Sequence, residues 1–216
     1  MIVLIEGLPG SGKTTTAKHL ETFLYQKNKN CNVFYEYSFD NPVGYTWSFE
    51  NAVKSIRETT ISDYPFDSWK GVGFHKDVIL ESRFLQNTSL FNMLNGGKFS
   101  ENIVFPKKIL KTLDKIHTKL ILLHQTDPLL FLNNVIKNRK TTCPEWFPFV
   151  SELFYESYWG RTNEASMEES FINGMVEWSH RQINIFKTLN VDKLLIENPS
   201  SDWNASLNKV FSFIDN

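Results

Sequence analysis

Cysteine is scarce in this sequence, and its scarcity excludes two kinds of protein. Only Cys31 and Cys143 occur in 216 residues, and neither lies in a Cys-x-x-Cys or Cys/His spacing. A disulfide framework or a structural zinc site would need more ligands at defined spacings. We therefore expect two ordinary thiols in a reducing compartment, and a cytoplasmic protein.

Long apolar runs and an excess of charge are also missing. No stretch approaches the ~18 apolar residues of a membrane span, and the apolar start at residues 1–5 lacks the basic leader of a secretion signal. Lys and Arg number 23 against 24 Asp and Glu, which leaves a formal net charge of -1. This balance gives no long-range attraction to nucleic acid or acidic membranes, so we expect neither as a partner.

One local group of lysines could still suggest a nucleic-acid contact. Its spacing equally fits the solvent face of an amphipathic helix, which is the interpretation that the neutral overall charge favours. The lysines are Lys107, Lys108, Lys111, Lys115 and Lys119. The apolar face of the same helix would carry Ile109, Leu110, Leu113 and Ile116.

The hydrophobic pattern predicts an α/β protein. Short apolar runs alternate with longer amphipathic stretches, which is typical of βαβ units, a parallel sheet and helices on both faces. The length suits one domain over residues 1–216, with a three-layer fold and a five-stranded sheet. The predicted strands are Ile2–Glu6, Asn32–Tyr37, Asp77–Glu81, Lys119–His124 and Lys193–Glu197.

Helix ends can be placed from capping and breaking residues. Asp127-Pro128 supplies an N-cap acceptor and a proline for the first turn, and Asn95-Gly96-Gly97 supplies a stop. An interruption is expected at Gly174. The predicted helices are Gly12 to about Lys27, Phe84 to Asn95, Leu129–Arg139, Met167–Leu189 and Ser201–Ile214.

The strongest motif is Gly7-x-x-x-x-Gly12-Lys13-Thr14, which follows an apolar strand and opens a helix. Its glycines let backbone N–H groups approach phosphate oxygens, and the helix N-terminus adds further donors. Lys13 would reach the β- and γ-phosphates, and the Thr14 hydroxyl would ligate Mg²⁺. The sequence therefore predicts a P-loop that binds ATP and Mg²⁺. Its nucleotide-binding residues are Gly7, Gly10, Ser11, Gly12, Lys13, Thr14 and Thr15.

The rest of the sequence narrows the class of P-loop protein. A guanine-reading Asn-Lys-x-Asp tetrapeptide is absent, and the chain is short for an ATP-driven motor. Glu81 ends the third predicted strand at the edge that carries the P-loop, where it could hold Mg²⁺ through water or accept a proton. Arg83 could neutralise charge on a transferring phosphoryl group. The alternative is that Glu81 or Ser82 caps the next helix.

The segments 5–7 and 10–15 resemble deoxynucleoside kinases and thymidylate kinases. Glu81-Ser82-Arg83 is similar to the acid-plus-arginine motif of that family, although the family places arginine directly after the acid. Asp40-Asn41-Pro42 and Phe84-Leu85-Gln86-Asn87 also resemble a group of uncharacterised bacterial P-loop proteins.

The resemblance implies further site residues. Family members place an acidic residue after the second strand, facing the acceptor hydroxyl, and Glu36 and Asp40 are both candidates here. A lid arginine would be Arg139, within a lid at about 139–165, and an acceptor-side insertion would span about 41–76. Arg161 could also contact phosphate from a loop, or lie as an ordinary surface residue.

An aromatic-rich stretch lies between the second and third predicted strands. Its rings could stack on a nucleobase or simply pack in the core. Gln86 could read an acceptor's polar edge. The rings are Tyr45, Trp47, Phe49, Tyr64, Phe66, Trp69 and Phe74.

These features predict an ATP- and Mg²⁺-dependent kinase whose partner is a small-molecule acceptor, with a nucleoside or nucleotide favoured. An antibiotic or another hydroxylated metabolite is an alternative acceptor, and a nucleotide-dependent regulatory ATPase is an alternative activity. The sequence leaves open whether the protein is a homodimer.

Overall fold

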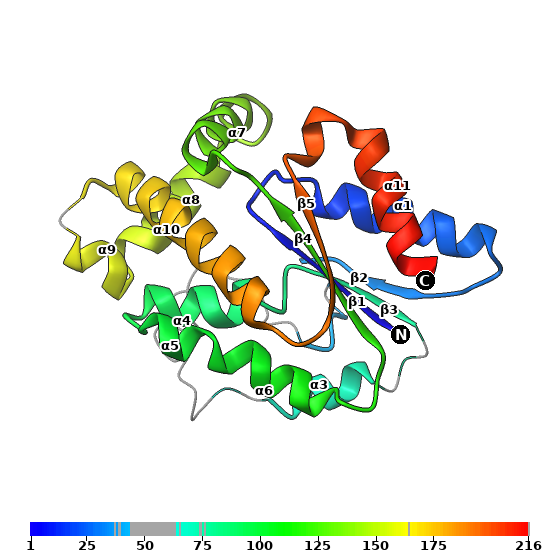
Figure 1. The fold of residues 1–216 in the computed structure, drawn as a ribbon. Helices are drawn as coiled ribbons and strands as arrows, with labels where there is room; N and C mark the ends of the chain where they lie inside the picture. Colours follow the sequence, from blue (N-terminus) through cyan, green and yellow to red (C-terminus); the bar gives the residue numbers. More distant parts are fainter. Residues whose placement is uncertain are drawn as a thin grey trace.

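A five-stranded parallel sheet forms the centre of the computed structural model in Figure 1, which describes residues 1–36, 38, 40–43, 64, 66–73, 75, 77–163 and 165–215. The strand order is β2-β3-β1-β4-β5. Every residue of the central strand β1 is buried, as expected for a strand covered on both faces. All five predicted strands are confirmed. Their bounds are β1 Ile2–Gly7, β2 Asn32–Phe34, β3 Val78–Glu81, β4 Thr118–His124 and β5 Asp192–Glu197.

The register of the sheet brings the ends of neighbouring strands to one edge. β1 pairs with β3 up to Ile5 opposite Glu81, and with β4 up to Gly7 opposite Leu123. The strand order reverses around β1, and such a reversal is where open parallel sheets bind their ligands. The P-loop therefore emerges at the expected position.

One face of the sheet is covered by α1 (Lys13–Gln26) and α11 (Trp203–Asp215), which lie side by side in Figure 1. Val3 and Ile5 of β1 contribute to the hydrophobic cluster on this face. Because side chains alternate along a strand, Ile2 and Leu4 enter the cluster on the other face.

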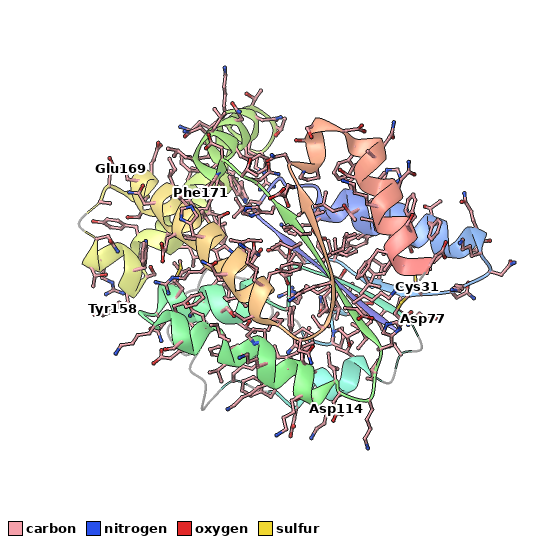
Figure 2. The ribbon with its side chains drawn as sticks, viewed as in Figure 1. Cys31, Asp77, Asp114, Tyr158, Glu169 and Phe171 are labelled. Carbon is pink, nitrogen blue, oxygen red and sulfur yellow. The ribbon has the colours of Figure 1, made fainter. Side chains whose placement is uncertain are left out.

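The other face carries most of the remaining helices (Figures 1 and 2). α10 is one continuous helix and packs against α7, α8, α9 and β4, so the interruption expected at Gly174 is wrong. A side chain there would meet the ring of Phe154 at 2.7 Å, so Gly174 lets α8 approach closely. The helices on this side are α3 Ser68–Val72, α4 Phe91–Leu94, α5 Phe99–Asn102, α6 Val104–Thr112, α7 Pro128–Thr142, α8 Trp146–Tyr155, α9 Tyr158–Thr162 and α10 Met167–Thr188.

Two further expectations need correction. The helix expected from Phe84 begins instead with a π-helical turn, η1 (Gln86–Leu90), before α4. Lys119 does not lie on the amphipathic helix, because α6 ends at Thr112 and Lys119 is buried in β4. Its ammonium group donates a hydrogen bond to the carbonyl of Phe213 at 2.6 Å. Lys107, Lys108 and Lys111 are exposed on α6, opposite the buried Ile109 and the half-buried Leu110, which confirms the solvent-face interpretation for these three. Lys115 is also exposed, but it follows the end of the helix.

The chain's end is also helical: a 3₁₀ turn, η2 (Pro199–Ser201), precedes α11. Among the described residues, no helix combines the length and the apolar character needed to cross a bilayer.

Candidate functional site

The P-loop, residues 7–14, connects β1 to α1 in a conformation that requires glycine. Gly10 and Gly12 have φ angles of 81° and 95°, in the left-handed region. A Cβ atom on Gly12 would also lie 2.5 Å from the ring of Trp203, at the start of α11. Any other residue at position 12 would therefore be strained and would clash.

The loop has the donors that an anion needs. Among the described residues, no hydrogen bond uses the backbone N–H groups of Gly12, Lys13 or Thr14, which open the first turn of α1. The buried ammonium of Lys13 donates to the carbonyls of Gly7 and Leu8, both at 3.0 Å. Free amides at a helix N-terminus together with a lysine fit a bound phosphate chain.

The other polar residues of the loop have different surroundings. The hydroxyl of Ser11 is buried and has no hydrogen-bond partner within the described part of the chain. Thr15 is exposed at the start of α1. Thr16 is buried and its hydroxyl donates to the carbonyl of Gly12 at 3.0 Å, so it has a structural role.

Thr14 and Glu81 meet at the carboxyl edge of the sheet. The Thr14 hydroxyl donates to Glu81 Oε1 at 2.6 Å. Mg²⁺ accepts oxygen ligands and keeps several waters, and it is usually held by one or two protein oxygens plus substrate phosphates. Groups of three or more His, Cys, Asp or Glu side chains that could hold a metal are absent from the described residues. Thr14 and Glu81 therefore fit Mg²⁺ that is held largely by a nucleotide.

The segment after β3 turns sharply at Ser82, which has a φ angle of 61°. The backbone N–H of Ser82 still donates to the carbonyl of Ile5 at 3.0 Å, so the turn starts where the β1–β3 ladder ends. The buried Arg83 then donates from Nη2 to the carbonyl of Glu36. The left-handed conformation of Ser82 thus accommodates the one residue that separates Glu81 from Arg83, where the family motif has none.

Glu36 follows β2 and lies in the same network. Its Oε1 accepts a hydrogen bond from Gln86 Nε2 at 2.5 Å, and its backbone N–H donates to Glu81 Oε2 at 3.4 Å. Burial raises the pKa of Glu36 above its ordinary value of 4.5, and Glu81 raises it further, whereas Lys13, Arg83 and the Gln86 hydrogen bond lower it. A carboxylate with a raised pKa is a stronger base than usual.

Other sequence-predicted residues have different contacts. Asp40 is exposed. The guanidinium carbon of Arg139, within α7, lies 4.0 Å from the ring centre of Trp146. The exposed Arg161 donates to the carbonyl of Glu156. The structure therefore gathers Glu36, Glu81 and Arg83, whereas the contacts described for Arg139 and Arg161 are with residues outside this group.

Three rings of the aromatic stretch belong to the core. Tyr64 and Trp69 are buried, and Trp69 Nε1 donates to the Tyr64 hydroxyl at 3.0 Å. Phe66 packs beside Tyr64 and Phe105. For these rings the core interpretation holds. Four others lie outside the described residues: Tyr45, Trp47, Phe49 and Phe74.

Sequence reasoning did not identify Glu6 as a site residue. Its carboxyl group is buried at the end of β1, and Oε1 accepts hydrogen bonds from the backbone N–H groups of Phe84 and Leu85 at 2.8 and 2.9 Å. Burial raises the pKa of Glu6 to about 7. The sequence signal that could have identified Glu6 is a single carboxylate that follows the apolar residues of the first strand.

Comparisons with known proteins agree with this architecture. A family model described as "Chromatin associated protein KTI12" matches residues 1–64. Two solved structures are similar at 14% sequence identity: YorR from Bacillus subtilis in complex with phosphorylated GDP, and deoxyadenosine kinase from M. mycoides with bound dATP. The TM-scores are 0.52 and 0.50; the first alignment covers 100% of this chain and 96% of the other, and the second covers both chains fully. No curated protein sequence matches the chain.

At this identity the likeness shows the fold alone. The chain has a three-layer α/β P-loop fold with a five-stranded parallel sheet, a fold that it shares with YorR and the deoxyadenosine kinase. The resemblance to P-loop kinases expected from the sequence is thereby confirmed at the level of the fold.

Proposed function

We propose that this protein is a kinase that transfers the γ-phosphoryl group of Mg²⁺-bound ATP to a hydroxyl of a small acceptor. One observation carries the proposal: a continuous set of contacts joins the P-loop to Glu36. Thr14 bonds Glu81, Glu81 accepts from the backbone of Glu36, and Gln86 bonds the Glu36 carboxylate. These hydrogen bonds connect the proposed nucleotide-binding loop to a candidate general base, Glu36.

The chain's own residues would have distinct roles in the transfer. The free amides of the loop and Lys13 would bind the β- and γ-phosphates. Glu36, rather than Asp40, would accept the proton of the acceptor hydroxyl, because Gln86 and Arg83 fix its position. Arg83 would contribute positive charge beside the transferring group.

Thr14 and Glu81 would hold Mg²⁺, directly or through water. Bound there, Mg²⁺ would neutralise charge on the β- and γ-phosphate oxygens. Positioning of two substrates and stabilisation of charge would account for most of the rate. Arg139 would act from the lid.

A nucleoside or nucleotide is the acceptor that we favour. The support is the resemblance to deoxynucleoside and thymidylate kinases and the fold shared with a deoxyadenosine kinase. An antibiotic or another hydroxylated metabolite would need the same base and the same loop. We further propose a cytoplasmic, single-domain protein with an acceptor-side insertion at about 41–76 and a lid at about 139–165.

A second candidate function is a regulatory ATPase without an acceptor. It is favoured by the match of residues 1–64 to a family described as chromatin-associated rather than as a kinase. This protein would bind and slowly hydrolyse ATP, and added acceptors would leave the rate unchanged.

The test is ADP release from Mg²⁺-ATP in the presence of nucleosides, nucleotides and other hydroxylated compounds. Wild-type protein is compared with Lys13→Ala, which removes the ammonium group that would bind phosphate, and with Glu36→Gln, which removes the base but keeps an acceptor oxygen for Gln86. Stimulation by one acceptor that both variants lose would support the kinase. An ATP-binding wild-type protein with the same rate across the panel would contradict it.

A further inference from the structure

Glu6 joins the P-loop strand to the acceptor side of the site. It immediately precedes Gly7, and its carboxylate accepts the backbone N–H groups of Phe84 and Leu85. These two residues lie between Arg83 and Gln86, the side chains that contact Glu36. One carboxylate oxygen therefore holds the middle of the segment 83–86.

The hydrogen bonds of Glu6 begin where the sheet ladder ends. β1 and β3 are paired up to Ile5 and Glu81, and the last backbone bond runs from Ser82 to Ile5. Ser82 then turns away from the strand direction with its positive φ angle. Beyond that turn, the backbone N–H groups of Phe84 and Leu85 donate to the Glu6 carboxylate. These two hydrogen bonds join β1 to the segment after β3.

Burial of the Glu6 carboxylate at this position costs free energy. The side chain is 1% exposed, and its Oε2 has no hydrogen-bond partner among the described residues. Burying a charged group without full hydrogen bonding disfavours the charged form, and this burial raises the pKa of Glu6 to about 7. The positive charge of the Lys13 ammonium opposes this shift.

We propose that Glu6 is a positioning residue that holds segment 83–86, and through it Glu36, in register with the P-loop. The inference rests on the proposed function, because the position of Glu36 relative to the P-loop affects turnover only when a phosphate donor and an acceptor react with each other. Glu6 contacts neither substrate. It acts through Phe84 and Leu85, and its loss leaves the phosphate-binding loop intact while the acceptor side moves.

Three variants separate this role from a general effect on folding. Glu6→Ala removes the acceptor oxygen, whereas Glu6→Gln keeps an oxygen that can accept both N–H groups. Leu4→Ala is the matched control, because Leu4 is a fully buried neighbour on the same strand and face. It creates a core cavity without touching the bonds to residues 84 and 85.

The first measurement is hydrogen exchange with Mg²⁺ and a non-hydrolysable ATP analogue. In Glu6→Ala, exchange of a peptide covering residues 82–90 should rise at least about tenfold, while α11 stays protected and the analogue still binds. Glu6→Gln should resemble wild type, and Leu4→Ala should show no selective loss at 82–90. Unchanged exchange at 82–90 in Glu6→Ala, or an equal effect of Leu4→Ala, would overturn the proposal.

The second measurement is transfer to whichever acceptor stimulates wild-type protein. Glu6→Ala should lower kcat by about 100-fold, with the KM for ATP nearly unchanged, because small misplacements of reacting groups have effects of this size. Glu6→Gln should recover most of the rate. A wild-type protein that no acceptor stimulates would contradict the proposed kinase function, and the exchange comparison would then decide the role of Glu6 alone.

Discussion

The hydroxyl of Thr14 and the carboxylate of Glu81 are hydrogen-bonded at 2.6 Å, although 67 positions separate them in the chain. The bond joins the first turn of α1 to the end of β3. It brings together the two protein oxygens that fit Mg²⁺.

Removal of the Thr14 hydroxyl or of the negative charge of Glu81 should raise the Mg²⁺ concentration that turnover requires. We expect Thr14→Val and Glu81→Gln each to raise the half-saturating Mg²⁺ concentration for turnover by about tenfold or more. Thr14→Ser keeps the hydroxyl and should stay close to wild type. A magnesium titration at fixed ATP measures this, and identical titration curves for wild type and Thr14→Val would refute the assignment.

Replacement of Lys13 should weaken nucleotide binding without unfolding the loop. Lys13→Met keeps an apolar stem in the buried position but removes the ammonium group. Because hydrogen bonds to charged groups contribute about 1.5–3 kcal/mol, affinity for Mg²⁺-ATP should fall about 10- to 100-fold in calorimetry. Lys18→Met, at an exposed position of the same helix, is the control and should bind normally.

The left-handed conformation of Ser82 predicts an unusual response to substitution. A non-glycine residue with this geometry costs about 1–2 kcal/mol, so Ser82→Gly should be neutral or slightly stabilising in spite of the added backbone freedom. Ser82→Val should destabilise by at least about 1 kcal/mol, because a β-branched residue is most strained at positive φ. Denaturant unfolding measures both, and a less stable Ser82→Gly would contradict the interpretation.

The raised pKa of Glu6 predicts how stability changes with pH. Its value is about 7 in the folded protein against 4.5 ordinarily, so between these values the folded state binds more protons than the unfolded state. The contribution of Glu6 is fully present below pH 4.5 and is lost as pH rises through 7. A change of one in pKa corresponds to about 1.4 kcal/mol, so the loss is about 3 kcal/mol in total.

Glu6→Gln isolates this contribution from that of other groups, including Glu36, whose pKa is also raised. The unfolding free energy of wild type minus that of Glu6→Gln should decrease steadily from pH 4.5 to 7.5. Chemical denaturation at a series of pH values tests the slope. Parallel curves for the two proteins would show that Glu6 does not titrate in this range.

Arg139 and Arg161 should differ in their effect on catalysis. If Arg139 leaves the Trp146 ring to contact phosphate during transfer, Arg139→Ala should lower kcat by at least about 100-fold while ATP still binds. Arg161→Ala should have little effect, because that guanidinium is exposed and bound to a backbone carbonyl. Steady-state kinetics of both variants decide between the two lid candidates, and equal losses would refute this choice.

The sheet and the P-loop were predictable because their signals are local. The apolar run at Ile2–Gly7 is followed at once by the glycines and Lys13, and strand, loop and helix start confirm one another. β3 and β4 were found for the same reason, since a buried parallel strand is a short continuous apolar run.

The connections within the site were not predictable, because they depend on residues distant in sequence. Gln86 bonds Glu36 across 50 positions, and Glu6 bonds the backbone of Phe84 across 78. Nothing near Ser82 in the sequence indicates a positive φ angle. Lys119 was misplaced because a lysine that follows other lysines at helical spacing is expected to be exposed, whereas this side chain is buried and its ammonium group reaches the carbonyl of Phe213.

The contact between Gly12 and Trp203 has a consequence for biosynthesis. A nascent polypeptide released from the ribosome only as far as β5 already contains the five strands of the described sheet, but the Trp203 indole beside the P-loop has not yet emerged. If the loop binds ATP as proposed, such a chain should bind it more weakly until α11 has docked. Nucleotide binding to this loop is therefore expected to depend on α11 as well as on the sheet.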